Sequence, residues 1–167
     1  MVPSNGNCIS LILIIFIATL TLSSFSVAQD KPEDFLAAHN KVRAADGVGP
    51  LKWSPTLALY ASSYANELAA GGCNNIHHSD GPFGENLAYS EGDLSGVKAV
   101  ELWADEKANY DYKSNTCAAG KICGHYTQVV WKDTLEVGCA KVKCPGGGTL
   151  ISCNYDPTGN YEGERPF

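Results

Sequence analysis

The pattern of apolar and polar positions predicts helices in the first half of the chain. Residues 30–47, DKPEDFLAAHNKVRAADG, place Asp30 as a candidate N-cap, Pro32 in the first turn and Gly47 as a stop. Residues 54–72 repeat this design, with a serine and a proline ahead of apolar residues at helical spacing and two glycines at the end. The sequence therefore predicts two amphipathic helices in this half.

A third helix is predicted over residues 94–110, and it carries a carboxylate on its apolar stripe. Ala99, Trp103 and Tyr110 share this stripe at positions i, i+4 and i+11. Glu106 falls on the same stripe at i+7. An unpaired buried charge is costly, so we expect Glu106 to reach a rim or to meet a partner, such as a salt bridge or a hydrogen bond at a helix end.

The second half of the chain has the pattern of strands. Residues 137–144, VGCAKVKC, alternate apolar residues with lysines, and residues 149–156, TLISCNYD, are short and rich in strand formers. The PGGG between them is typical of a turn, which predicts an antiparallel hairpin. Helices followed by antiparallel strands favour a layered α+β domain.

An apolar run at residues 9–22 stands apart from these amphipathic patterns. With the small residues that follow it, the run predicts a secretory signal peptide over residues 1–28, cleaved between Ala28 and Gln29. A membrane anchor is the alternative, but the run is shorter than the roughly 20 residues that a spanning helix needs. We therefore expect one secreted, extracellular domain over residues 29–167, with no membrane span of its own.

Charge and cysteine content narrow the classes of partner and the compartment. The net charge of -6 gives no electrostatic attraction to nucleic acid or to anionic lipid surfaces. Six cysteines follow residue 28, which in an oxidising compartment predicts three disulfides, with 15 possible pairings. A zinc–cysteine cluster is disfavoured because the chain contains no C-x-x-C pair.

Histidines and two carboxylates are the candidates for site chemistry. The set is His39, His77, His78, His125, Glu85 and Glu106. Two histidines and two carboxylates suit a divalent metal, but the spacing matches no compact motif such as H-E-x-x-H, so two unrelated pairs are an equal possibility. Nucleophilic and phosphate-binding signatures, G-x-S-x-G and the Walker loop, do not occur.

Five motifs along the chain resemble those of one known family. HNKVR, GENLAYS, WADEKANYDY, CGHYTQVVW and CNYDPTGNYEGERPF, in this order, are similar to those of the plant pathogenesis-related proteins of class one, in the CAP superfamily. The resemblance covers residues 29–167 and implies an α-β-α sandwich around a three-stranded antiparallel sheet. It also implies three disulfides, which join Cys73 to Cys144, Cys117 to Cys123, and Cys139 to Cys153.

The resemblance further implies a cleft of two histidines and two glutamates, which in some members of the family holds zinc. Matched motif by motif, these residues are His78, Glu85, Glu106 and His125. His77 stands next to His78, so either ring is a candidate for the first position. His39 and Arg43 lie outside this set and are expected to support packing and hydrogen bonding. No cofactor is expected to be required, although zinc or another divalent cation fits the set.

The function implied by the resemblance is defence against fungal or oomycete pathogens, without catalysis, from the plant apoplast or vacuole. The expected mechanism is binding of a sterol or related lipid, with Tyr110 and Tyr112 in the lipid-contacting loop NYDYKSNTC. A second expected mechanism is cleavage between Asp156 and Pro157, which would release residues 157–167 as a signalling peptide for a receptor. The composition of that segment suits an exposed, poorly structured tail, and the alternative is a docked tail held near Cys153 by its disulfide. The alternative function is a metal-dependent hydrolase that uses the His/Glu set.

Overall fold

The computed structural model describes residues 30–167. The predicted signal peptide, 1–28, and its cleavage site at Ala28 and Gln29 lie outside these residues and stay predictions. Within the described residues, no helix combines the length and the apolar character that crossing a membrane requires.

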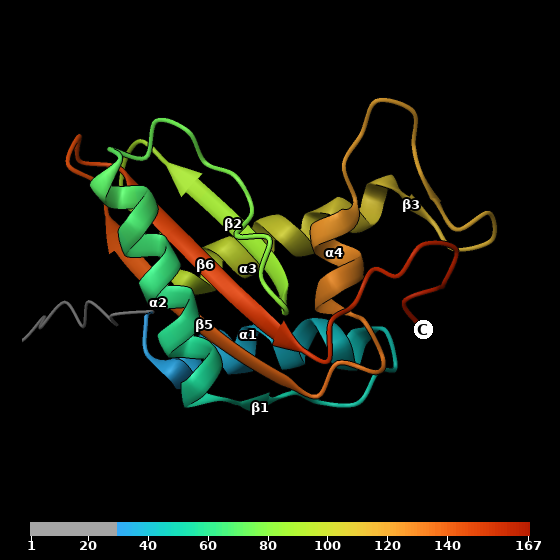
Figure 1. Ribbon diagram of the computed structural model, residues 1–167. Helices are drawn as coiled ribbons and strands as arrows, with labels where there is room; N and C mark the ends of the chain where they lie inside the picture. Colours follow the sequence, from blue (N-terminus) through green and yellow to red (C-terminus); the bar gives the residue numbers. More distant parts are fainter. Residues whose placement is uncertain (1–29) are drawn as a thin grey trace, which may run out of the picture.

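Helices and strands alternate along the chain in an α+β order (Figure 1). The helices are α1 (Pro32–Ala45), α2 (Pro55–Ala70), α3 (Gly96–Asp105) and α4 (Gly124–Val129), with a 3-10 turn η1 (Glu106–Asn109) after α3. The strands are β1 (Lys52–Trp53), β2 (Gly84–Ser90), β3 (Tyr110–Asp111), β4 (Thr116–Cys117), β5 (Glu136–Lys143) and β6 (Thr149–Asp156). The predicted hairpin is confirmed as β5 and β6.

One sheet forms the centre of the molecule, in the order β1-β5-β6-β2. Strands β5, β6 and β2 pair antiparallel, as expected. The expectation of three strands is wrong in one respect, because the two residues of β1 add a short parallel strand beside β5. A two-residue strand is too short to show an alternation of apolar and polar residues, so only its pairing with β5 defines it.

Helices cover both faces of this sheet, which gives the expected α-β-α layers (Figure 1). Helix α2 packs on β5 and β6, and one core cluster joins Leu68 of α2 to Leu150 of β6. A second cluster joins Ile151 to residues of α1, α3 and α4. Neighbouring residues of β6 thus face different cores, which explains why nearly all of this strand is buried. Gly138 lets α2 approach β5, since a Cβ there would lie 2.1 Å from the backbone nitrogen of Ala58.

Two boundaries of the helices differ from the sequence prediction. Asp30 does not cap α1, because its carboxylate accepts hydrogen bonds from the backbone of Gly96 and from Lys141. The N-cap is Lys31 instead. The third helix ends at Asp105 rather than at Tyr110, so Tyr110 belongs to β3. The first difference arises because long-range partners draw the Asp30 carboxylate away from its own helix. For α2, the predicted start at the Ser-Pro pair and end at the double glycine are confirmed.

The three disulfides join the pairs that the resemblance implies. The first links the end of α2 to the residue after β5, the second fastens β4 to the start of α4, and the third crosses from β5 to β6. The pairs are Cys73–Cys144, Cys117–Cys123 and Cys139–Cys153.

A buried polar network holds α1 against the rest of the core. The Arg43 guanidinium donates to four backbone carbonyls, those of Gly49, Val129, Trp131 and Thr134. The His39 ring is fully buried, and its Nδ1 lies 2.8 Å from the carbonyl oxygen of Phe35. Because that carbonyl can only accept, Nδ1 carries the proton and Nε2 accepts from the Tyr155 hydroxyl at 2.9 Å. This network is the supporting role expected for His39 and Arg43.

Candidate functional site: two histidine–carboxylate pairs and an aromatic loop

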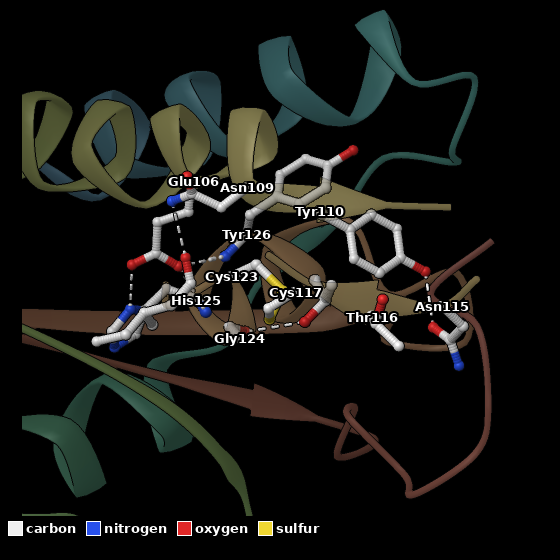
Figure 2. The surroundings of a disulfide bond; sticks show 12 residues. Glu106, Asn109, Tyr110, Asn115, Thr116, Cys117, Cys123, Gly124, His125 and Tyr126 are labelled. Carbon is white, nitrogen blue, oxygen red and sulfur yellow. Dashed lines mark hydrogen bonds and ion pairs between the residues drawn. A yellow bond between two sulfur atoms is a disulfide. The ribbon is translucent and has the colours of Figure 1, made fainter. Parts of the chain in front are cut away.

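The first pair joins the end of α3 to the start of α4 (Figure 2). Glu106 Oε1 accepts from His125 Nδ1 at 2.7 Å, and Oε2 accepts from the backbone N–H groups of His125 at 3.0 Å and Tyr126 at 3.4 Å. The inward carboxylate predicted from periodicity therefore meets its partner at a helix end. The ring of Trp103 stacks on His125 with centroids 6.4 Å apart, which fixes the imidazole plane.

The second pair lies at the start of β2. His78 Nδ1 donates to Glu85 Oε1 at 2.8 Å, and the Ser79 backbone N–H donates to the same oxygen at 3.1 Å. The Glu85 side chain is 5% exposed, whereas that of His78 is 58% exposed. Glu85 Oε2 is buried and has no hydrogen-bond partner in the described part of the chain. His77 instead places Nδ1 against the carbonyl of Asn75, so His78 is the ring that pairs with the carboxylate.

Both pairs leave the same atom of each imidazole for other partners. A carboxylate only accepts hydrogen bonds, so each Nδ1 is the donor and each Nε2 is the ring nitrogen that remains for another partner. Carboxylates that hold a histidine in this way commonly orient it toward a metal. The donor types therefore suit zinc, with the two Nε2 atoms as ligands and the carboxylates behind them.

The two pairs do not form a centre of three or four converging ligands. Among residues 30–167, the group whose ligand atoms all lie within 4.8 Å of one another is His39, Cys139 and Cys153. Its two thiols are joined as a disulfide, and both nitrogens of His39 are already hydrogen-bonded, so this group has no ligand to offer. A metal held by the four predicted cleft residues stays a prediction.

The sequence reasoning missed two buried amides, of which one bonds to His125 and the other lines a hollow with His78 and Glu85. Asn86 Nδ2 donates to the carbonyl of His125 at 3.0 Å and to the Tyr155 hydroxyl at 3.2 Å. Gln128, also buried, accepts from the backbone of Gly159 at 3.3 Å. Each amide stands beside apolar residues, in GENLAY and TQVVW, and a polar side chain in such a setting is the signal that would have found them.

Comparison with known proteins settles the family. The sequence pattern of the cysteine-rich secretory protein family, CAP, matches residues 36–155. This chain belongs to the CAP family. It is 56% identical to pathogenesis-related protein 1 of Arabidopsis thaliana, over 98% of this chain and 99% of that protein. It is 54% identical to pathogenesis-related protein 1A of Nicotiana tabacum, over 89% and 88% of the two chains. The solved structure of venom allergen-like protein 4 of Schistosoma mansoni superposes with a TM-score of 0.64 at 30% identity, covering 81% of this chain and 92% of that one.

A loop that precedes α4 in the chain carries the predicted lipid contacts. We call residues 110–117, with β3 and β4 at its ends, the aromatic loop; Figure 1 shows it projecting from the body of the molecule. The Tyr110 hydroxyl donates to Asn115 Oδ1 at 2.7 Å (Figure 2). Tyr112 is 46% exposed, and its ring meets that of Tyr110 edge to face at 6.5 Å.

The C-terminal segment, residues 157–167, is docked on this CAP domain rather than poorly structured. Most of it is exposed, as its composition predicts, but hydrogen bonds hold it at both ends. At its start, the Thr134 hydroxyl donates to the carbonyl of Pro157 at 2.8 Å. Near its end, the Lys132 N–H donates to the carbonyl of Pro166 at 2.7 Å. The predicted tail is thus exposed but ordered, because backbone carbonyls in a glycine- and proline-rich segment can still be bonded from neighbouring loops.

One hollow of this CAP domain lies beside the aromatic loop, and another lies between α1 and α3. A cavity of about 270 Å³ lies between the aromatic loop and the C-terminal segment, and Tyr110, Trp131 and Tyr161 contribute rings to its lining. A groove of about 290 Å³ runs between α1 and α3. The apolar part of the groove consists of Ala38, Val42, Ala45, Val97, Val100 and Ala104.

Proposed function

We propose that this CAP chain is a secreted plant defence protein that binds a sterol or related lipid of fungal or oomycete pathogens and does not act as an enzyme. Its similarity to pathogenesis-related proteins of Arabidopsis and tobacco supports the defence role. The observation that carries the lipid mechanism is the aromatic loop, which projects from the domain and lines a cavity of about 270 Å³ together with Trp131 and Tyr161. Cavities of nearly this size, lined by aromatic rings and a few polar groups, are typical of small-molecule sites.

The groove between α1 and α3 is a second surface that supports lipid binding. Its lining contains six alanine and valine side chains, and charged residues such as Lys41, Asp46 and Lys107 stand beside them. An apolar floor with a charged rim suits a molecule with a long apolar body and a polar end. The two surfaces offer alternative positions for the same class of ligand, so the variants below distinguish them.

The histidine–carboxylate pairs support a structural or cation-binding role more than hydrolysis. Glu106 accepts three hydrogen bonds from α4 and its side chain is only 18% exposed, so it is committed to holding the helix. A hydrolytic metal needs three protein ligands and one open position. We propose that His78 and His125 bind a divalent cation through Nε2. Calorimetry with zinc tests this, since His125→Ala should abolish binding that His77→Ala leaves intact.

Release of a signalling peptide is a second proposed activity. The Asp156 carbonyl accepts from the Leu135 N–H at 3.0 Å, and the Pro157 carbonyl is bonded to the Thr134 hydroxyl. A protease must bind its substrate in an extended form, so cleavage after Asp156 requires these bonds to open first. A chain that lacks residues 157–167 should lose immune signalling when applied to leaves.

Growth of a sterol-requiring oomycete tests the leading proposal. We expect the full oxidised protein to inhibit growth, and we expect excess added sterol to relieve the inhibition. Tyr112→Ser should weaken inhibition if the aromatic loop is the site, whereas Val97→Glu should weaken it if the groove is the site. Inhibition that added sterol does not relieve, or that a chelator abolishes, contradicts sterol capture and favours the metal-dependent hydrolase.

A further inference from the structure

The end of the C-terminal segment lies directly on the aromatic loop. The Tyr112 hydroxyl donates to the carbonyl of Phe167 at 2.6 Å, and Asn115 Nδ2 donates to the carbonyl of Glu164 at 2.9 Å. In the reverse direction, Arg165 donates through Nε to the carbonyl of Tyr112 at 3.2 Å and through Nη2 to that of Lys113 at 3.1 Å. We call residues 164–167 the strap. These four hydrogen bonds join the strap to residues 112–115 of the aromatic loop.

The ring that the lipid is expected to contact is already in use. The Phe167 ring stacks on Tyr112 with centroids 5.2 Å apart and planes 22° apart. The Arg165 guanidinium lies 5.8 Å from the centroid of the same ring. An aromatic ring has only two faces, and a flat apolar molecule needs one of them. The strap therefore covers the surface that a ligand of the aromatic loop would bind.

The strap also lines one side of the cavity beside the loop. Tyr110 and the Cys117–Cys123 disulfide form one side of this cavity, and Glu164 and Pro166 of the strap contribute to the other. Pro166 is buried, whereas the neighbouring Arg165 is exposed and its guanidinium bonds to two carbonyls of the loop. Displacement of the strap would join the cavity to the free face of Tyr112.

We propose that the strap is an autoinhibitory contact, and that a sterol-like ligand must displace it from the aromatic loop in order to bind. This inference rests on the proposed lipid-binding function and adds a regulated site to it. When the strap leaves, the Tyr112 hydroxyl and the Asn115 amide lose their acceptors, and the carbonyls of Tyr112 and Lys113 lose their donor. The ligand that replaces it is a flat apolar molecule with a hydroxyl group at one end, because such a molecule restores the stacking and satisfies these polar groups.

Displacement makes ligand binding and release of the C-terminal segment reciprocal. A ligand that binds only the open state has its apparent affinity reduced by the fraction of molecules that are open. By linkage, the same ligand must raise that open fraction by the same factor. Bound sterol thus frees residues 164–167 from the loop and exposes these four residues to proteases.

Removal of the strap is the direct test. Binding of a fluorescent sterol is measured for the oxidised chain of residues 29–167, for the same chain ending at Gly163, and for the full-length Phe167→Ala and Arg165→Ala variants. With an open fraction of about one tenth in the intact protein, we expect roughly tenfold tighter binding without the strap and a smaller gain in each point variant. Glu162→Gln, an exposed change in the same segment outside the strap, is the matched control and should leave the affinity unchanged.

Each outcome separates this inference from the proposed function. If the intact chain binds sterol and the chain without the strap binds it equally well or more weakly, the inference is wrong but lipid binding stands. That result is expected for a ligand in the α1–α3 groove. No binding by any of the chains overturns lipid binding and the inference together. The point variants keep the test valid if the shortened chain does not fold. As a second readout, saturating sterol should speed the trimming of residues 164–167 from the intact chain by a carboxypeptidase, and no acceleration would contradict reciprocal coupling.

Discussion

Replacement of Glu106 by alanine should destabilise the domain without removing lipid binding. The carboxylate is the partner of two backbone N–H groups at the start of α4 and of the His125 ring. With alanine, all three donors lose their acceptor, and the 18% exposure of the Glu106 side chain allows water only limited access to replace it. The change therefore tests whether this member of the predicted cleft acts as an anchor for α4.

The magnitude follows from the two kinds of hydrogen bond that are lost. Loss of a side-chain cap at a helix start costs about 1 kcal/mol. Loss of a hydrogen bond to a charged group costs about 1.5–3 kcal/mol. With partial solvation by water, we expect Glu106→Ala to lower the free energy of unfolding by about 2–4 kcal/mol and the Tm by roughly 10 °C. Glu106→Gln keeps one acceptor oxygen and should cost about half as much.

The assay is urea unfolding with the disulfides intact, followed by tryptophan fluorescence, since Trp103 stacks on His125. Asp105→Ala is the control, because Asp105 is the neighbouring carboxylate but is exposed. Sterol binding by the folded Glu106→Ala variant should be unchanged. A loss of stability no larger than that of Asp105→Ala would refute the anchoring role, and loss of turnover with stability intact would support a hydrolase.

Two further predictions concern stability. Burial lowers the pKa of His39 to about 4, against an ordinary value of about 6.5, so the unfolded chain takes up this proton first as the pH falls. Stability is therefore lost between about pH 6.5 and pH 4, by roughly 3 kcal/mol, and urea unfolding across this range should show a flatter profile for His39→Gln. The disulfides should differ by loop length: replacing Cys117 and Cys123, 6 residues apart, should cost about 2 kcal/mol, and replacing Cys73 and Cys144, 71 apart, about 4 kcal/mol. Equal losses in the two double variants would contradict the chain-entropy explanation.

Elements with local signals could be predicted from the sequence. The Ser-Pro start and double-glycine end of α2, and the turn between β5 and β6, are set by residues next to one another in the chain. Strand β2 was not predicted, because Glu85 and Asn86 interrupt its apolar pattern. The end of α3 was misplaced because it depends on a bond from Glu106 to His125, 19 residues away.

The candidate site, like the fold, could be predicted from the sequence only in part. The inward position of Glu106 is readable from helical periodicity. Its partner His125 is not, because the loop closed by Cys117 and Cys123 lies between the two residues in the chain. The resemblance to the family placed His78 and Glu85 in one cleft, but their pairing, and the exclusion of neighbouring His77, came only from the contacts. The docking of the C-terminal segment had no signal in composition, because exposed polar residues with bonded backbones look like a free tail.

Equilibrium binding of a labelled sterol to the oxidised chain of residues 29–167, with and without excess unlabelled sterol, tests the central claim most directly. If the protein captures sterol at the aromatic loop, we expect saturable binding that the competitor displaces and that Tyr112→Ser weakens. Failure of a correctly disulfide-bonded sample to bind would contradict lipid capture and leave the release of residues 157–167 as the better explanation of defence.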